Sequence, residues 1–225
     1  MPRPMTPARK RTAAATEEPA RRAMGPQGER TRRRLMEAAR TTFKERGYPA
    51  TRVDDIAREA GTSHGAFYLY FSNKADILEA LAVETSERMI NLADELEGIE
   101  IGPEGYAHIR TWVDTFVRSY AHDAPVLNAW VQGATEDPRF DKLGRNLLGR
   151  YSEKISKAIE RSVKRDGRAL DSRIAGTALV AMLERVCYFM MVRGAGLDHE
   201  SAVETLTTLC YQAIFGAHPE PAPSG

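Results

Sequence analysis

The chain of 225 residues is poor in the residues that most catalytic and metal sites require. It contains only two cysteines, Cys187 and Cys210, and its five histidines are scattered along the sequence. Neither His-Glu-x-x-His nor Cys-x-x-Cys spacing occurs, and no glycine-rich phosphate loop is visible. We therefore expect no enzymatic activity, no metal and no cofactor. Two cysteines in apolar helical contexts are typical of reduced, buried thiols.

Long hydrophobic runs are also missing. The mean hydropathy is −0.44, and the longest apolar stretch, residues 178–192, is interrupted by Glu184 and Arg185. These two charges suggest an interface pair, a ligand contact or a surface position. The N-terminus carries charge but no apolar segment, so it does not resemble a secretory signal. We predict a cytoplasmic protein without a membrane partner.

Charge is unevenly distributed along the chain. Residues 1–34 contain ten Lys/Arg and three Asp/Glu, a net charge of +7, although the whole chain carries only +1. A basic end on a mildly acidic body suits a protein that touches a polyanion at one end, although basic tails are also common as solvated segments. Residues 1–27 are interpreted as a disordered basic arm and residues 217–225 as a loose tail.

Hydrophobic spacing and glycine or proline breaks predict an all-α fold. Residues 28–75 should form a three-helix head, which a long fourth helix, about 74–97, joins to a helical body over 76–216. The head helices are expected from Glu29 to Gly47, from a capping box at 51–54 to about Glu59, and from Thr62 or Ser63 to about Phe71. The body helices are expected at 106–121, 126–133, 139–165, 171–192 and 199–215, with Pro125 as a break.

Residues 51–74 read as a short helix, a glycine turn and a second short helix. Ile56 and Phe67 should face each other, and Ala57 should be small where the helices cross. Gly61 should take the left-handed conformation that glycine adopts without strain. This is the pattern of a helix-turn-helix, whose second helix enters the major groove of double-stranded DNA.

Side chains on and beside the second helix divide by chemistry. His64 begins it, where base edges are usually met, and Gly65 permits close approach. Tyr68, Tyr70 and Lys74 are placed to bind phosphates. The predicted DNA-binding set is Arg52, Thr62, Ser63, His64, Gly65, Ala66, Tyr68, Leu69, Tyr70 and Lys74. Two of these residues have alternative roles: His64 could be a solvated residue at the start of the helix, and Tyr70 could only pack against the core. An ordinary charged helix face is an equal alternative for Arg30, Arg32, Arg33 and Arg34.

Residues 29–80 resemble the DNA-binding domain of the tetracycline-repressor (TetR/AcrR) family of bacterial regulators. Arg52 and Thr62 depart from the family pattern. The resemblance implies a homodimeric transcriptional regulator, expected to be a repressor released from a palindromic operator by a small, apolar effector. An activator, or a ligand-independent architectural or co-regulatory dimer, stays open. The matching positions are Phe43, Gly47, Tyr48, Thr51, Asp55, Ile56, Ala57, Ala60, Gly61, Ser63, Gly65, Phe67, Tyr68, Tyr70, Phe71, Lys74 and Leu78.

In this family the C-terminal body dimerises and encloses a small-molecule pocket. Here aromatic and methionine side chains at helical spacing suit an apolar ligand, although a plain core explains the same pattern. The candidate pocket residues are Trp112, Phe116, Tyr120, Asn128, Trp130, Met182, Tyr188 and Phe189. The last two helices are expected to form a four-helix bundle with a second copy. The candidate dimer residues are Leu179, Leu183, Val186, Leu206, Leu209, Cys210 and Ala213.

Overall fold

The computed structural model describes residues 25–96, 98–135 and 137–216, and within these ranges it contains eight helices and no strand. The all-α prediction is confirmed. The predicted basic arm up to residue 24 and the predicted tail lie outside the described residues. The helices are α1 (Pro26–Arg46), α2 (Val53–Glu59), α3 (His64–Phe67), α4 (Lys74–Asp94), α5 (Pro103–Ala134), α6 (Pro138–Asp166), α7 (Ser172–Met191) and α8 (His199–Phe215).

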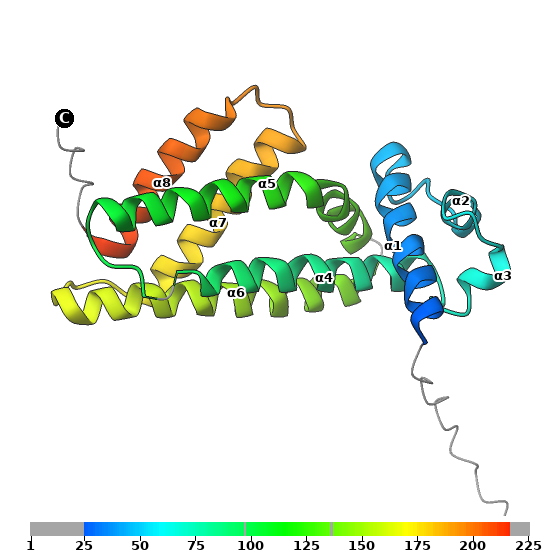
Figure 1. The fold of residues 1–225 in the computed structure, drawn as a ribbon, viewed down its shortest axis with the longest axis horizontal. Helices are drawn as coiled ribbons and strands as arrows, with labels where there is room; N and C mark the ends of the chain where they lie inside the picture. Colours follow the sequence, from blue (N-terminus) through cyan, green and yellow to red (C-terminus); the bar gives the residue numbers. More distant parts are fainter. Residues whose placement is uncertain (1–24, 97, 136, 217–225) are drawn as a thin grey trace, which may run out of the picture.

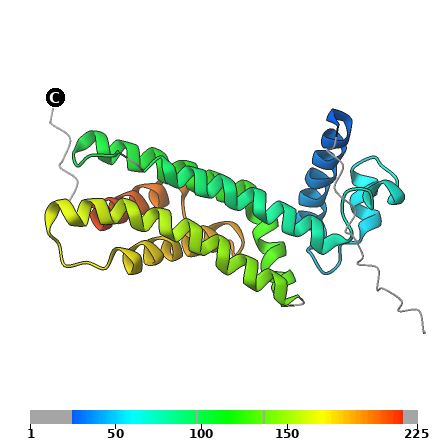
Figure 2. The same ribbon diagram turned by 90° about the horizontal axis from the view of Figure 1, so that it is seen from below.

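Helices α1–α3 form a head at one end of an elongated molecule, and α5–α8 form the body (Figure 1). Helix α4 starts in the head and continues along the body, where it lies beside α6 (Figure 2). Helix α6 packs against α7 and α5 packs against α8. Because α4 belongs to both parts, a change in the body can reach the head through a continuous helix.

The start of α2 lies one residue later than the predicted capping box. Arg52 is the N-cap residue, and its backbone N–H donates to the carboxylate of Asp55 over 3.1 Å. The hydrogen bond from Arg58 is the main reason that the pKa of Asp55 lies below its usual value. Thr51 does not cap α2. Its hydroxyl donates to the carbonyl of Gly47 over 2.7 Å and closes the turn after α1.

Helix α3 is shorter than predicted. Ser63 is its N-cap, with Oγ accepting from the backbone N–H of Ala66 over 3.1 Å, and the regular helix ends at Phe67. The next two residues continue in tighter bonds, from the N–H of Leu69 to Ala66 and from the N–H of Tyr70 to Phe67. This tightening brings the chain back to the head core. Asn73 then caps α4 as expected, accepting from the N–H of Asp76.

Pro125 does not end a helix, contrary to the sequence prediction. Residues 106–121 and 126–133 belong to one helix, α5, with Pro125 inside it. Proline removes one helical N–H and leaves the carbonyl four residues earlier without its bond. That carbonyl belongs to Ala121, an exposed residue, so water can satisfy it. Figure 1 shows α5 changing direction near its C-terminal end, towards the head.

The described residues form two hydrophobic cores. The larger core lies inside the body. The smaller one fills the head, but it also includes Val126 and Ala129 of α5 and Phe140 of α6, all at most 2% exposed. The head is therefore completed by residues that lie far from it in the sequence.

Helix α7 is the one described helix that is long and apolar enough to cross a membrane by length and composition. Core helices of water-soluble proteins pass the same test, and α7 packs along α6. Only 28% of its most apolar window is buried within the subunit. Much of α7 therefore presents an apolar surface outward.

The contact between α6 and α7 depends on Gly176. A Cβ atom added there would lie 2.2 Å from Ser156 Oγ and 2.8 Å from the backbone nitrogen of Ser156. The serine hydroxyl can rotate away, but the backbone of a buried helix cannot. Gly176 thus lets the two helices approach more closely than any other residue would.

Replacing Gly176 with alanine should therefore destabilise the fold, by about 1–3 kcal/mol for overpacking. Urea unfolding followed by circular dichroism measures this loss. Gly149→Ala is the matched control, because it lies in α6 with open space around it. The control should gain about 0.5–1 kcal/mol from helix propensity. Equal unfolding midpoints for the two variants would contradict the proposed close approach.

Candidate functional site

The crossing of α2 and α3 has the geometry that the sequence predicts for a helix-turn-helix. Ile56 and Phe67 are fully buried, and Ala57 is 2% exposed. Gly61 has a φ of +60°, which confirms the predicted left-handed turn. The turn is thus set by one backbone conformation and by the packing of three side chains.

Arg34 of α1 fixes this turn from outside. Its guanidinium donates to the carbonyls of Ala60 and Gly61, the latter over 3.2 Å. The guanidinium of Arg32 lies 5.4 Å from the centre of the Phe71 ring. Two of the four arginines in this stretch of α1 therefore hold the head together. No spacing rule in the sequence distinguishes these two arginines from Arg33, and Arg33 and Arg34 are both exposed.

The outer side of α3 and the residues beside it form an exposed surface, here called the reading face. Leu69 is 80% exposed and Tyr68 is 50% exposed, although both are large and partly or wholly apolar. Nothing in the head core requires these side chains to project outward. The reading face consists of Ser63, His64, Gly65, Tyr68 and Leu69, with Thr62, Ala66 and Tyr70 half-buried at its edge.

Two predicted DNA-binding residues have partners within the protein. His64 Nε2 lies 3.4 Å from an oxygen of Asp54, and its ring packs edge-on against Tyr68. Lys74 Nζ donates to the carbonyls of Tyr48 over 2.8 Å and Pro49 over 3.2 Å. It also lies 4.4 Å from the centre of the Tyr48 ring. Lys74 therefore also holds the turn after α1, whereas the His64 contact is exposed and weak.

The letters Gly61-Thr62-Ser63-His64-Gly65 match the Gly-x-Ser-x-Gly pattern of hydrolases. That pattern needs a sharp strand-to-helix turn that exposes the serine. Here it joins two helices, and Ser63 Oγ is the helix cap. In the described part of the head, the pattern therefore belongs to the helix-turn-helix.

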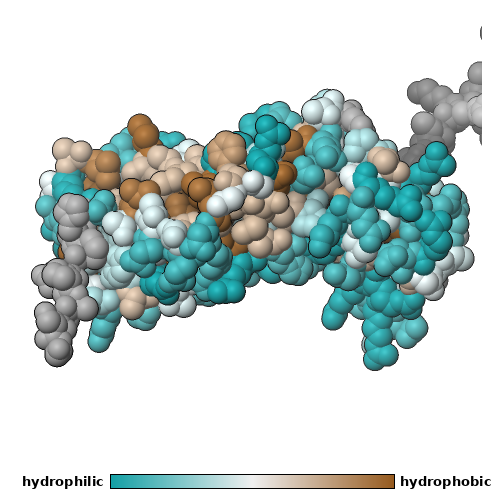
Figure 3. All heavy atoms as spheres, turned by 90° about the horizontal axis from the view of Figure 1, so that it is seen from above, coloured by the Kyte–Doolittle hydropathy of each residue, from teal (hydrophilic) through white to brown (hydrophobic). Residues whose placement is uncertain are grey.

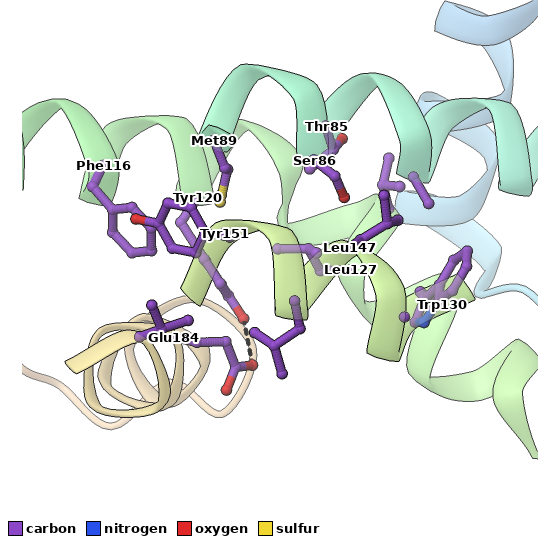
Figure 4. A pocket seen from close by; sticks show the side chains of 15 residues that line it. Thr85, Ser86, Met89, Phe116, Tyr120, Leu127, Trp130, Leu147, Tyr151 and Glu184 are labelled. Atoms are coloured by element: carbon purple, nitrogen blue, oxygen red, sulfur yellow. Dashed lines mark hydrogen bonds between the residues drawn. The ribbon is translucent and has the colours of Figure 1, made fainter. Parts of the chain in front are cut away.

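A second candidate site is a cavity of about 190 Å³ inside the body, between α4, α5, α6 and α7 (Figure 4). Among the predicted pocket residues, Phe116, Tyr120 and Trp130 line it. The full lining is Ala82, Thr85, Ser86, Met89, Phe116, Tyr120, Val126, Leu127, Trp130, Gly144, Leu147, Leu148, Tyr151, Val180 and Glu184.

The other predicted pocket residues lie elsewhere. Trp112 donates its indole N–H to the carbonyl of Leu92 over 2.8 Å, so it joins α5 to α4 within the core. Met182 and Tyr188 pack against the body core from its edge. Phe189 is 44% exposed. Helical spacing cannot tell which part of a wide apolar face meets a cavity.

Asn128 also lies outside this cavity. It borders a separate hollow beside Arg40 and His122, where α5 meets α1. Gln132, one turn further along α5, accepts a hydrogen bond from the backbone N–H of Tyr48 over 2.9 Å. The polar side chains on this part of α5 therefore face the head.

Glu184 is the one carboxylate on the wall of the cavity. Its Oε1 accepts a hydrogen bond from the hydroxyl of Tyr120 over 3.2 Å (Figure 4). Burial, and then the charge of Glu184, raise the pKa of Tyr120 far above its usual value. Tyr120 is consequently a neutral donor, and Glu184 supplies the negative charge of the site.

The predicted dimer residues are largely turned inward. Leu179, Leu183, Leu206 and Cys210 are at most 6% exposed within the single subunit. Val186 and Ala213 are half-buried, and Leu209 is 42% exposed. Helices α7 and α8 are apolar on more than one side, so the sequence could not separate core from surface. The outward face of α7 consists of the apolar residues Ile174, Ala178, Ala181 and Phe189, with the exposed Arg185 between the last two.

A cluster of charges joins the head to the body. Asp123 of α5 is 1% exposed, and its Oδ1 lies 2.5 Å from a guanidinium nitrogen of Arg40 in α1. Arg88 of α4 donates to both oxygens of Asp123, over 2.7 and 2.9 Å. Glu84 bonds Arg88 over 2.6 Å and lies 3.5 Å from Arg40. The members of this charge cluster are far apart along the chain, so no spacing pattern in the sequence indicates it.

Aromatic rings make a second connection from the cavity to the head. Trp130, on the cavity wall, packs against Phe140 with ring centres 4.7 Å apart. Phe140 packs edge-on against Tyr48, and Tyr48 contacts Phe43 of α1. Displacement of Trp130 by a ligand would therefore shift Phe140 and Tyr48, which position the head.

The charge cluster should be energetically coupled, because removing one partner leaves a buried charge unpaired. Asp123→Asn should cost about 3–5 kcal/mol in the free energy of unfolding. A double-mutant cycle with Arg40→Gln should give a coupling of about 1.5–3 kcal/mol. Urea unfolding of the four proteins measures it.

Asp141 and Arg145 provide the control pair, since both are more than 60% exposed on the surface of α6. Their coupling should not exceed about 0.5 kcal/mol. A value for Asp123 and Arg40 no larger than this would contradict the role of the buried cluster.

Comparison with known proteins supports the reading of the head. The profile of the family described as "Bacterial regulatory proteins, tetR family" matches residues 35–81. The chain is 30% identical over 132 residues to the HTH-type transcriptional repressor AcnR of Corynebacterium diphtheriae, covering 55% of this chain and 70% of that protein. It is 26% identical over 218 residues to the HTH-type transcriptional regulator EthR of Mycolicibacterium smegmatis, covering 92% and 97%.

The fold of the described residues agrees with these sequence matches. A putative TetR-family regulator from Syntrophomonas wolfei superposes with a TM-score of 0.67 at 20% identity, covering 83% of this chain and 95% of that one. These similar proteins are described as regulators of transcription, not as enzymes. The chain belongs to the TetR family of bacterial helix-turn-helix transcriptional regulators.

Proposed function

We propose that this protein is a cytoplasmic, homodimeric repressor that binds a palindromic operator and leaves it when a small molecule enters the body cavity. The observation that carries the proposal is the reading face, an exposed surface on a rigid helix-turn-helix. One similar protein, AcnR of Corynebacterium diphtheriae, is described as a repressor, which favours repression over activation for this chain.

The reading face has suitable chemistry for base edges. His64 can donate or accept a hydrogen bond, and Thr62 and Ser63 supply hydroxyl groups at the start of α3. Leu69, which projects into solvent, is suited to contact a thymine methyl group. A Cβ atom added at Gly65 would meet no other atom within 4 Å, so the backbone there is open and can approach the bases closely.

Phosphate contacts would come from the residues around the reading face. Arg52 is exposed at the start of α2, and Tyr70 lies at the edge of the reading face. Lys74 uses two of its three N–H groups on backbone carbonyls, which leaves one for a phosphate. These contacts position the head without reading sequence.

The outward side of α7 and α8 is the proposed dimer interface. Ile174 is 69% exposed, Phe189 44% and Leu209 42%. Figure 3 shows hydrophobic residues gathered on the side of the body away from α6, whereas the head is mostly hydrophilic. Ala178 and Ala181 lie on the same face of α7 as Ile174 and are small enough to let two helices approach. A second copy would cover this surface and set the distance between the two heads.

Helix α5 would transmit occupancy of the cavity to the head. Tyr120, Val126 and Trp130 line the cavity, and Asp123 lies between them in sequence and bonds Arg40. A ligand that moves this stretch of α5 would shift the head through the charge cluster and Phe140. Release from mostly bound to mostly free requires about 5.5 kcal/mol of differential affinity for a two-state change.

Two head variants test the proposed DNA interface, using duplexes that the wild-type protein selects from a random library. His64→Ala should reduce the difference in binding free energy between selected and random duplex by about 1–3 kcal/mol. Arg52→Ala should weaken binding to both duplexes alike and lower the salt slope by about one unit. Fluorescence anisotropy over a series of salt concentrations measures both effects.

Selected duplexes should contain two related half-sites in inverted orientation. No enrichment of any sequence by the wild-type protein would overturn the proposal of an operator-binding protein. Identical behaviour of the two variants would overturn the separation between base-reading and phosphate-binding residues.

The dimer interface is tested by a charge on the outward face of α7. Ala178→Glu should convert the dimer to a monomer, because a carboxylate would be buried without a partner. Sedimentation velocity at micromolar concentration measures the state. Ala107→Glu, at an exposed position of α5, makes the same chemical change and should leave the dimer intact. A monomeric wild-type protein, or a dimeric Ala178→Glu variant, would refute this interface.

A further inference from the structure

The body cavity combines an almost wholly apolar wall with a single negative charge. Its lining contains no lysine, arginine, histidine or aspartate, and Glu184 is the one acidic residue. Thr85, Ser86, Tyr120 and Tyr151 provide neutral hydroxyl groups. Any charged ligand would therefore meet the carboxylate of Glu184 and no cation on the wall.

The carboxylate of Glu184 has unused capacity to accept hydrogen bonds. Two carboxylate oxygens offer about four acceptor positions, and the Tyr120 hydroxyl uses one of them. The guanidinium of Arg185 is 3.7 Å from the other oxygen, but the side chain of Arg185 is 59% exposed and also lies over the Tyr188 ring, and that of Glu184 is 39% exposed. Such an exposed ion pair is weak, so Arg185 neutralises little of the negative charge of Glu184.

Tyr151 does not supply an alternative charge at this wall. Burial raises its pKa well above the usual value, and the neighbouring Cys187 and Cys210 act in the same direction. Its hydroxyl therefore stays neutral, and the charge of the cavity rests with Glu184 alone. Figure 4 shows the Glu184 and Tyr120 side chains meeting at one end of the site, with Trp130 at the other.

We infer that the cavity selects a small lipophilic amine, whose ammonium group bonds Glu184 while its alkyl or aryl part lies between Met89, Leu127 and Trp130. This inference rests on the proposed function, since it names the class of molecule that the effector site takes. A cavity of this size holds a molecule somewhat larger than benzene, which fills an apolar cavity of about 150 Å³.

The opposite charge would be rejected for the same reason. A carboxylate ligand of the same length would place a second negative charge beside the half-buried carboxylate of Glu184, where water screens the repulsion only in part. An alcohol would keep the apolar contacts and one hydrogen bond but lose the charge. The order of affinity is therefore amine, then alcohol, then carboxylate.

Hexylamine, 1-hexanol and hexanoate test this order at pH 7, because they share one alkyl chain and differ in the head group. Binding to the full-length protein without DNA is measured by titration calorimetry, supported by quenching of tryptophan fluorescence, since Trp130 lines the cavity. Hexylamine should bind at least about tenfold more tightly than 1-hexanol.

Glu184→Gln keeps the size of the side chain and removes its charge. In this variant the amine should lose its advantage, the alcohol should bind as before and the carboxylate should bind more tightly than to the wild type. Glu204→Gln is the matched control. Glu204 also bonds a tyrosine hydroxyl of α5, that of Tyr106 over 2.6 Å, but it lies outside the cavity. This control should retain the wild-type order.

Three results would overturn the inference: hexanoate binding as tightly as hexylamine, an amine preference that survives in Glu184→Gln, or no binding of any of the three compounds. Operator affinity is measured separately, with and without hexylamine. Amine binding that leaves operator affinity unchanged would refute release by an effector but not the ligand class. Loss of the amine preference with intact operator binding would refute the ligand class alone.

Discussion

The buried carboxylate of Asp123 constrains the relation between the two parts of this protein. It is 1% exposed and is paired with arginines from two other helices, Arg40 and Arg88. A buried charge without partners is strongly unfavourable, so α5 cannot move away from α1 and α4 unless both arginines follow or the cluster breaks. The cluster therefore favours a small number of discrete arrangements of head and body over continuous bending. A regulator that must be either bound or released needs such discrete states.

The hydrophobic packing also joins the head to the body through α5. The buried α5 residues after Pro125, Val126 and Ala129, belong to the head core, whereas the buried apolar residues before Pro125 belong to the body core, against which half-buried Leu127 also packs. Proline at the junction leaves one carbonyl without its helical bond, which makes this the natural place for a change of direction. The cavity lies along the same stretch, with Tyr120 before the proline and Trp130 after it. The proposed ligand cavity, the change of direction of α5 and the contacts that position the head thus lie within about three turns of one helix.

The sequence predicted the head well because its determinants are local. Gly61 and the pair Ile56 and Phe67 lie within a few residues of each other, and each has one plausible role in a helix-turn-helix. The body was predicted only as a set of helices, since the same apolar spacing serves core, cavity and interface. Leu183 was predicted at the dimer interface and Trp112 in the pocket, but both lie in the body core. Contacts such as Asp123 with Arg40, separated by 83 residues, leave no pattern in a single sequence. A helix break was expected at Pro125, but the carbonyl that this proline leaves without its helical bond belongs to the exposed Ala121, where water can reach it.

We expect the head and the end of α5 to unfold as one cooperative unit, because they share one hydrophobic core. Amide hydrogen exchange of the wild-type protein, followed residue by residue over low denaturant concentrations, tests it directly. Amides of α1, α2 and residues 126–134 should open together, with one free energy of opening and one dependence on denaturant concentration. Opening of α1 and α2 at a clearly lower free energy, with residues 126–134 still protected alongside the body core, would contradict it.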